Sequence, residues 1–194
     1  MRRVIRPLAV MLLAVVALSA CQDGADDEPR PQPSATTSPQ VVSAGSLAAG
    51  QPVARPRGEV VLTMSGQIAT HNQGRKLVLD LGSLERMRTV RLETTEPFLK
   101  RRVKFDGVML ADLLAVAGVP SSASKLHVTA LDDYKVDFTL DDVRSSQMLL
   151  ATKADGKRMP IDRAGPIRVV FPDGSNLGRN PDLWIWSVST MQLS

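Results

Sequence analysis

The stretch Lys104–Leu114, KFDGVMLADLL, decides how this chain folds. Its second half belongs to an apolar run, Leu110–Ala117 (LADLLAVA), whose length and spacing are those of an α-helix. Gly118 and the dipeptide Val119-Pro120 follow, and they end the helix because glycine adopts the left-handed C-cap conformation and proline cannot continue a helix. The stretch therefore predicts a short helix with a sharp end.

Short alternating segments lie on both sides of this helix and are typical of β-strands. We expect strands at 59–65, 76–81, 89–94, 125–131, 135–140, 148–153, 167–171 and 184–191. The pair around Asp132-Asp133-Tyr134 predicts a hairpin, and Ser83 and Asp141 each begin a short helical segment. Because strands and helices do not alternate regularly, we predict a mixed, strand-rich α+β fold in a single domain, residues 59–194.

The N-terminus has the composition of an export signal. Arginines near the start precede an apolar run at 8–17, which is too short to span a bilayer as a mature helix. Two small residues then precede Cys21, the only cysteine of the chain. We expect a signal peptide at 1–20. Its removal would take away three of the 24 basic residues and no acidic one, lowering the formal charge from +4 to +1.

Residues 21–58 predict a disordered tether. The segment is rich in proline, serine, threonine and alanine and has few large apolar side chains. Such a composition buries too little surface to offset the entropy lost on ordering. As a flexible coil the segment would span about 30–35 Å, enough to lift a domain away from a membrane.

The composition also limits the chemistry of the domain. A charge near +1 and the absence of basic clusters interleaved with aromatics argue against nucleic-acid binding. Without cysteine, the domain offers no thiol for a disulfide, a metal or a nucleophile. His71 and His127 are the only histidines: we expect His71 in a solvated loop and His127 as a packing or surface residue of a strand. No metal-binding, Ser-His-Asp or phosphate-loop pattern is present.

The tetrapeptide Leu18-Ser19-Ala20-Cys21 resembles the lipobox of bacterial lipoproteins. The resemblance implies lipid on the Cys21 thiol and acyl chains that anchor the protein to a membrane. The alternative is an ordinary cysteine in a signal peptide. Because Gln22 rather than aspartate follows, we expect a periplasm-facing lipoprotein of the cell envelope, with a preference for the outer membrane.

Five segments of the domain, in the right order, resemble signatures of the sulfite-oxidase-type molybdopterin-binding domain family. They are Lys104–Leu114, Ala130–Tyr134, Met148–Ala151 with Asp155-Gly156, Gly165–Pro172 (GPIRVVFP) and the late strand that begins at Trp184. The resemblance covers nearly the whole domain and implies the family's strand-rich fold.

One departure affects the expected activity. Enzymes of this family bind molybdenum through a cysteine upstream of the Phe-x-Gly-Val turn, but Leu92–Phe98 contains none. Threonine and glutamate oxygens replace a soft thiolate poorly on this metal. We therefore expect a non-catalytic protein without the molybdenum cofactor or any other tightly bound one. A short, cysteine-free branch of exported proteins that bind a free pterin is also similar, because its Thr-x-Thr-Pro-aromatic loop is close to Thr94–Phe98.

A pterin is flat and has a guanidine-like edge, so it needs an aromatic surface and a carboxylate acceptor. The expected ligand-binding residues are Thr95, Glu96, Phe98, Asp133, Tyr134, Trp184 and Trp186, with Asp132 as a further acceptor candidate. Trp184 and Trp186 should share one face of a strand, although two such tryptophans often belong to a core. Arg168 could hold an acid or form a surface ion pair, and the basic run Lys100–Lys104 could be a solvated face or contact an acidic partner.

Three functions are compatible with these observations. The first is an envelope lipoprotein that binds a pterin-like molecule and relays its occupancy to a membrane-bound enzyme of cyclic-di-GMP signalling, by a difference in partner affinity between the bound and empty forms. The second is a molybdopterin-dependent oxidoreductase that lacks the usual cysteine ligand. The third is an envelope interaction protein without a ligand.

Overall fold

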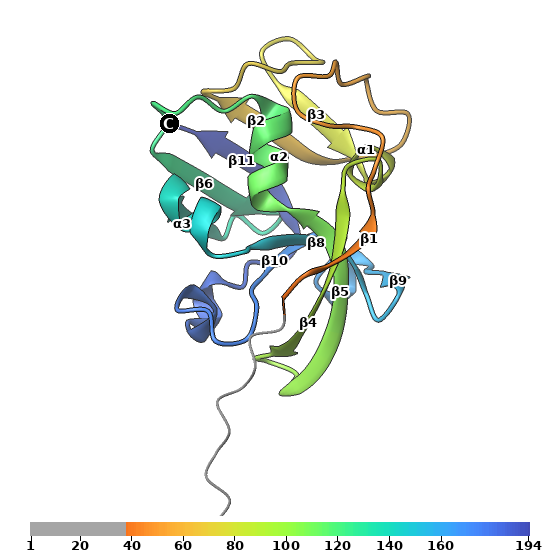
Figure 1. Ribbon diagram of the computed structural model, residues 1–194, viewed down its shortest axis with the longest axis vertical. Coiled ribbons are helices and arrows are strands. Elements are labelled where there is room, and N and C mark those ends of the chain that lie inside the picture. Colours follow the sequence, from red (N-terminus) through yellow and green to blue (C-terminus); the bar gives the residue numbers. More distant parts are fainter. Residues whose placement is uncertain (1–37) are drawn as a thin grey trace, which may run out of the picture. The chain divides into compact units, whose positions relative to one another are not determined.

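The computed structural model of the protein describes residues 38–194, which form two β-sheets around one hydrophobic core (Figure 1). The strand-rich α+β fold predicted from the sequence is confirmed. The predicted signal peptide, Cys21 and the first part of the tether lie outside the described residues. No helix within residues 38–194 is both long enough and apolar enough to cross a membrane.

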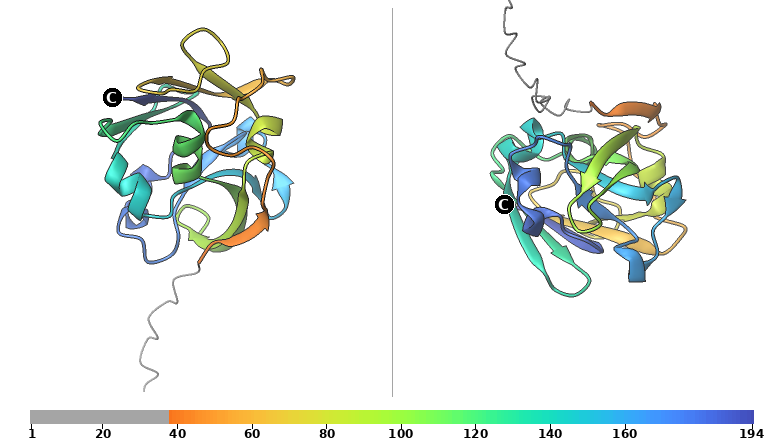
Figure 2. Two further views of the ribbon diagram at one scale, coloured as in Figure 1. Left: turned by 45° about the horizontal axis from the view of Figure 1, so that its top comes forward. Right: turned by 90° about the horizontal axis from the view of Figure 1, so that it is seen from below.

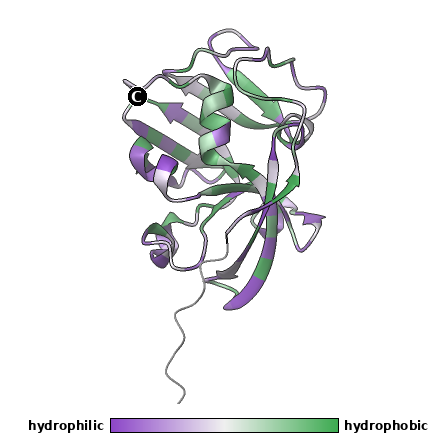
Figure 3. Cartoon of the chain, viewed as in Figure 1, coloured by the Kyte–Doolittle hydropathy of each residue, from purple (hydrophilic) through white to green (hydrophobic). Residues whose placement is uncertain are grey.

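The first sheet has six strands in the order β1-β4-β5-β8-β10, with β9 paired to β8. Its strands are β1 (Gln40–Ser43), β4 (Thr89–Glu96), β5 (Arg101–Met109), β8 (Leu149–Ala154), β9 (Lys157–Arg158) and β10 (Arg168–Val170). All of its pairs are antiparallel. The long hairpin β4–β5 forms its centre, and Figure 3 shows that β5 begins in a hydrophilic stretch.

The second sheet has five strands in the order β3-β2-β11-β6-β7, and its β2–β11 pair is parallel. Its strands are β2 (Val60–Gly66), β3 (Leu77–Asp80), β6 (Lys125–Ala130), β7 (Lys135–Thr139) and β11 (Val188–Leu193). The predicted hairpin is confirmed as β6–β7, with Asp133 in the left-handed region at φ +67°. The helices α1 (Leu81–Glu85), α2 (Leu110–Ala117) and α3 (Leu140–Ser145) connect strands of both sheets (Figure 2).

Helix α2 has the bounds that the sequence predicts, and Gly118 ends it in the left-handed region at φ +65°. Just before it, Gly107 lies in β5 against the backbone of β8. A Cβ atom on Gly107 would collide with the backbone of Leu150 and Ala151. The glycine of the Phe-x-Gly-Val turn is therefore required by the close approach of two strands.

Three local predictions differ from the structure. Helix α1 is capped by Asp80, whose carboxylate accepts the Ser83 N–H at 2.7 Å, so Ser83 lies inside the helix. Strand β11 begins at Val188 rather than at Trp184. The folded part also begins before the expected boundary at residue 58, because β1 pairs with β4 and the side chains of Leu47 and Val53 are buried.

Candidate functional site

A cavity of about 620 Å³ lies at the C-terminal end of β4, beside the buried strand β10. Its walls come from β4, β5, the β8–β9 hairpin, the 3-10 helix η1 (Ile161–Arg163), β10 and the segment before β11. Its cationic lining residues are Arg101, Lys157, Arg158, Arg163 and Arg168. We call it the basic cavity.

Arg168 is the buried centre of the basic cavity. Only 4% of the residue is exposed, and its Nη2 donates to Glu96 Oε1 at 2.7 Å. Its Cζ lies 5.0 Å from the ring centroid of Trp186 and 5.4 Å from that of Phe105. Its Nε is buried and has no hydrogen-bond partner among the described residues. Burial lowers the pKa of Arg168 while the Glu96 carboxylate raises it, and a guanidinium stays charged in proteins.

Glu96 uses its carboxylate mainly for hydrogen bonds within the fold rather than for a ligand in the cavity. Its side chain is fully buried, and Oε2 accepts the backbone N–H groups of Phe98 at 2.8 Å and Leu99 at 2.6 Å. With the bond from Arg168, three of its roughly four acceptor positions are occupied. The carboxylate expected to bind the edge of a pterin thus holds the β4–β5 turn and a buried cation.

The rim of the basic cavity carries an excess of positive charge. Arg101 pairs with Asp155 at 3.1 Å and Arg158 with Glu85 at 2.9 Å, whereas Lys157 and Arg163 form no ion pair among the described residues. The acidic lining residues are Glu96, Asp155 and Asp162, fewer than the cationic ones. An excess of positive charge attracts ligands of the opposite sign, so this cavity favours an anion.

A smaller cleft of about 270 Å³ brings together four of the expected ligand-binding residues and the further acceptor candidate Asp132. Its lining residues are Phe98, Ala130, Asp132, Tyr134, Pro181, Asp182, Trp184, Ile185 and Trp186. Trp186 lines both this cleft and the basic cavity, and its ring meets that of Phe98 edge-on at 4.8 Å between centroids. The aromatic residues of the prediction are thus adjacent, but most of them face a cleft beside the basic cavity.

The two tryptophans both line this cleft but differ in burial, and they do not lie in a strand as expected. Trp184 is buried against Phe171, and its Nε1 donates to the Gly178 carbonyl at 2.9 Å. Trp186 is 39% exposed. The prediction assumed a strand at these positions, but the residues follow the 3-10 helix η3 (Pro181–Leu183) and precede β11 in irregular backbone.

Thr95 and Asp133 line neither cavity. The backbone N–H of Thr95 donates to Asp173 Oδ1 at 2.9 Å, and Asp173 also accepts from Thr94 Oγ1 and Arg102. Burial raises the pKa of Asp173, but these hydrogen bonds outweigh burial and lower it. Asp173 is an organising residue that sequence reasoning missed, because its partners lie more than 70 residues away.

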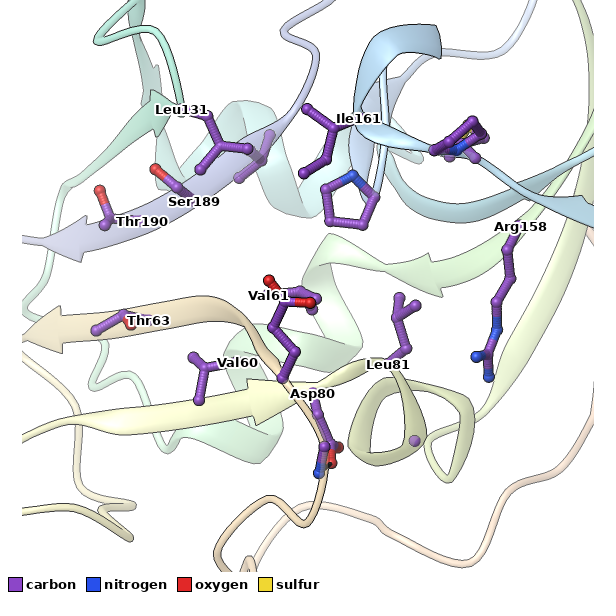
Figure 4. A pocket seen from close by; sticks show the side chains of 17 residues that line it. Val60, Val61, Thr63, Asp80, Leu81, Leu131, Arg158, Ile161, Ser189 and Thr190 are labelled. Carbon is purple, nitrogen blue, oxygen red and sulfur yellow. Dashed lines mark hydrogen bonds between the residues drawn. The ribbon is translucent and has the colours of Figure 1, made fainter.

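A third cavity, of about 600 Å³, lies on the other side of the segment Arg158–Pro160 and is shown in Figure 4. Val61, Leu81 and Ile161 give it a largely apolar wall. Asp80 at its edge is bound by the backbone N–H groups of Arg57, Gly58 and Ser83. Burial raises the pKa of Asp80, but these hydrogen bonds outweigh burial and lower it to about 2.

The described residues contain no group of three histidine, cysteine or carboxylate side chains that could hold a metal ion. His127 contacts Asp137 at 2.7 Å across the partly exposed β6–β7 pair, and His71 lies exposed in a loop. Neither histidine lines any of the three cavities described above.

Comparison with known proteins agrees with the fold. Residues 68–178, more than half of the chain, match the family model of the oxidoreductase molybdopterin binding domain. No match was found among curated proteins. The sulfane dehydrogenase SoxCD from Paracoccus pantotrophus has a similar fold, with a TM-score of 0.54 and 18% identity over 68% of this chain. The chain covers 37% of that SoxCD chain.

The family match corrects two expectations. We expected a non-catalytic protein in which the molybdenum cofactor is absent, and both expectations are wrong: the matched family is one of oxidoreductase domains that bind molybdopterin. One missing thiolate does not exclude the cofactor, since a pterin cofactor is also held by contacts to its ring and its anionic tail. The fold, the order of the sequence signatures and the family match together show that the chain belongs to the oxidoreductase molybdopterin binding domain family.

Proposed function

We propose that the domain binds a molybdopterin-type cofactor in the basic cavity and takes part in an oxidoreductase reaction. The observation that carries this proposal is the buried Arg168, which lines the cavity and whose Nε has no hydrogen-bond partner among the described residues. A buried donor without a partner costs about 1–3 kcal/mol, and a ligand acceptor would remove that cost. The volume of about 620 Å³ lies within the range of cofactor sites.

The residues present fit the organic part of such a cofactor. Arg168 would donate to an acceptor of the pterin, and Trp186 would supply an aromatic surface. The rim cations Arg101, Lys157 and Arg163 would hold an anionic tail such as a phosphate. When bound, the group supplies redox chemistry at its metal. The described residues place no thiol at this cavity, so thiolate ligands of the metal would come from the cofactor itself.

The neighbouring side chains maintain the charge and shape of the site. Glu96 balances the charge of Arg168 and fixes its position, because the carboxylate is itself held by the β4–β5 turn. The rings of Phe105 and Trp186 lie beside the guanidinium and exclude water from it. Low local polarity strengthens each hydrogen bond to a bound anion.

The test is the pterin content of the protein, purified from a host that makes the molybdenum cofactor. Acid and iodine treatment should release a fluorescent pterin, and metal analysis should find molybdenum in step with it. Arg168→Met should lose both. Arg91→Met is the matched control, because it removes the Arg91–Asp106 ion pair, which lies outside the cavity lining. Wild-type protein that releases no pterin from such a host contradicts the proposal.

We also propose that Cys21 is lipidated and anchors the domain in the cell envelope through the tether. The support is the sequence Leu18-Ser19-Ala20-Cys21 and the proline-rich composition after it. Cys21→Ser should move the protein from the membrane fraction to the soluble fraction and remove an acyl mass increment. An unchanged distribution of the variant contradicts the anchor. A cyclic-di-GMP enzyme as membrane partner stays a prediction, which co-purification with the anchored protein would test.

A further inference from the structure

The cleft beside the basic cavity collects exposed aromatic side chains from three separate segments. Phe98 comes from the β4–β5 turn, Tyr134 from the β6–β7 turn and Trp186 from the segment before β11. They are 50%, 46% and 39% exposed, and they are the chain's exposed aromatics among residues 38–194. Exposed apolar side chains that gather at one concave site are typical of an interaction surface, whereas single scattered ones are not.

The cleft also carries negative charge. Asp132 and Asp182 line it, and no lysine, arginine or histidine is among its lining residues. The carboxylate of Asp182 has no hydrogen-bond or ion-pair partner among the described residues, and that of Asp132 accepts only the Tyr134 N–H, at 3.2 Å. The charge is therefore opposite to that of the basic cavity on the other side of Trp186. We call this site the aromatic–acidic cleft.

The walls of the aromatic–acidic cleft are held in place before any ligand arrives. The Tyr134 hydroxyl donates to the Asp182 carbonyl at 3.1 Å and so ties the β6–β7 turn to η3. Trp184 is fixed by its bond to Gly178, and Phe98 packs edge-on against Trp186 with 74° between the rings. Preformed sites of this kind lose little conformational entropy on binding.

We propose that the aromatic–acidic cleft is a docking site for a partner protein that inserts an arginine side chain. A guanidinium stacks on aromatic rings and pairs with carboxylates through a planar set of donors, which a lysine ammonium lacks. Tyrosine and tryptophan are also enriched at the energetic centres of protein interfaces. The inference rests mainly on side chains outside the basic cavity, namely those of Phe98, Asp132, Tyr134 and Asp182. Trp186 alone is shared between the two sites.

The experiment uses the indole N–H signals in a ¹H–¹⁵N spectrum of the full chain, which has two tryptophans. The probe is the peptide acetyl-Gly-Arg-Gly-amide. The Trp186 signal should shift with increasing peptide, whereas the Trp184 signal, bonded to Gly178, should change little. The same peptide with citrulline, which keeps the shape without the charge, should bind about tenfold more weakly.

A double variant, Asp132→Asn with Asp182→Asn, should abolish the shift of Trp186. Asp141→Asn removes an exposed carboxylate of α3 outside the cleft and should leave binding unchanged. An unmoved Trp184 signal shows that each variant is folded. Equal binding of the arginine and citrulline peptides, or a shift that survives the double variant, overturns the proposal. Guanidinium ion that binds as tightly as the peptide would also overturn it, since the cleft would then select a small cation rather than a protein.

Discussion

Glu96 and Arg168 meet from positions 72 residues apart and form a buried ion pair, with 0% and 5% of the side chains exposed. Such a pair adds little net stability over an apolar pair, but removal of one partner leaves an uncompensated buried charge. The pair therefore couples the β4–β5 turn to β10 and keeps a cation in the basic cavity. A single substitution should therefore lower the free energy of unfolding more than a double substitution that removes both charges.

Glu96→Gln should lower the free energy of unfolding by about 3 kcal/mol, because Arg168 loses its counter-charge in a buried site. Denaturant unfolding measures this, and Glu96→Gln combined with Arg168→Met should recover part of the loss. Asp141→Asn breaks an exposed pair with Arg144 and should cost less than about 0.5 kcal/mol. A change of under 1 kcal/mol for Glu96→Gln would contradict a coupling role.

Asp80 links stability to pH. Its pKa is about 2 in the folded protein against an ordinary value of 3.8, so the folded state binds its proton less tightly than the unfolded state. The resulting stability, about 2 kcal/mol, is present above pH 3.8 and disappears as pH falls through 2.

Asp80→Asn tests this linkage. The variant should be less stable than wild type by about 2 kcal/mol at pH 6, since Asn cannot offer the same charged acceptors to Arg57, Gly58 and Ser83. The difference should shrink as pH falls from 4 to 2. Urea unfolding midpoints of both proteins, measured across that pH range, test this prediction. A difference that stays constant at all pH values would contradict the link between Asp80 and the pH dependence of stability.

At the scale of elements, the β5–β8 pair depends on one small residue. Gly107→Ala should cost about 2 kcal/mol or more, because its Cβ has no room against the backbone of Leu150 and Ala151. Gly82→Ala in α1 is the matched control. A Cβ there would meet its nearest atom, of Asp80, at 3.6 Å, so the variant should be neutral or more stable by up to about 1 kcal/mol. The melting temperatures of both variants, measured by thermal unfolding, test this difference in stability.

The sequence did not predict strand β1 or the correct start of β11, for two different reasons. The edge strand β1 has the composition of a tether, and all four of its residues are exposed. Its pairing with β4 comes from backbone hydrogen bonds, which leave no hydrophobic pattern. The segment before β11 has the composition of a strand, but Ser187 lies in the left-handed region at φ +47°, so the strand begins only at Val188.

At the scale of the whole molecule, a ligand of the basic cavity should stabilise the fold. At a hundred times its dissociation constant, a ligand adds about 2.7 kcal/mol, or about 5–10 °C for a domain of this size. A pterin that carries a phosphate should raise the melting temperature more than the same pterin without one. Lys157→Gln with Arg163→Gln should remove the difference, since these rim cations have no ion pair within residues 38–194. Equal shifts for both pterins would argue against an anion-binding rim.

The sequence by itself determined the parts of this protein that depend on neighbours along the chain. Helix α2 with Gly118, the β6–β7 hairpin and the ordered signatures that indicate the family all rest on local patterns. Only the tertiary structure decided which polar groups meet. Contacts between distant segments produce the pairing of Glu96 with Arg168 and the role of Asp173. They also bury Trp184 while leaving Trp186 exposed. Those contacts depend on how the two sheets pack, and a one-dimensional pattern does not contain that information.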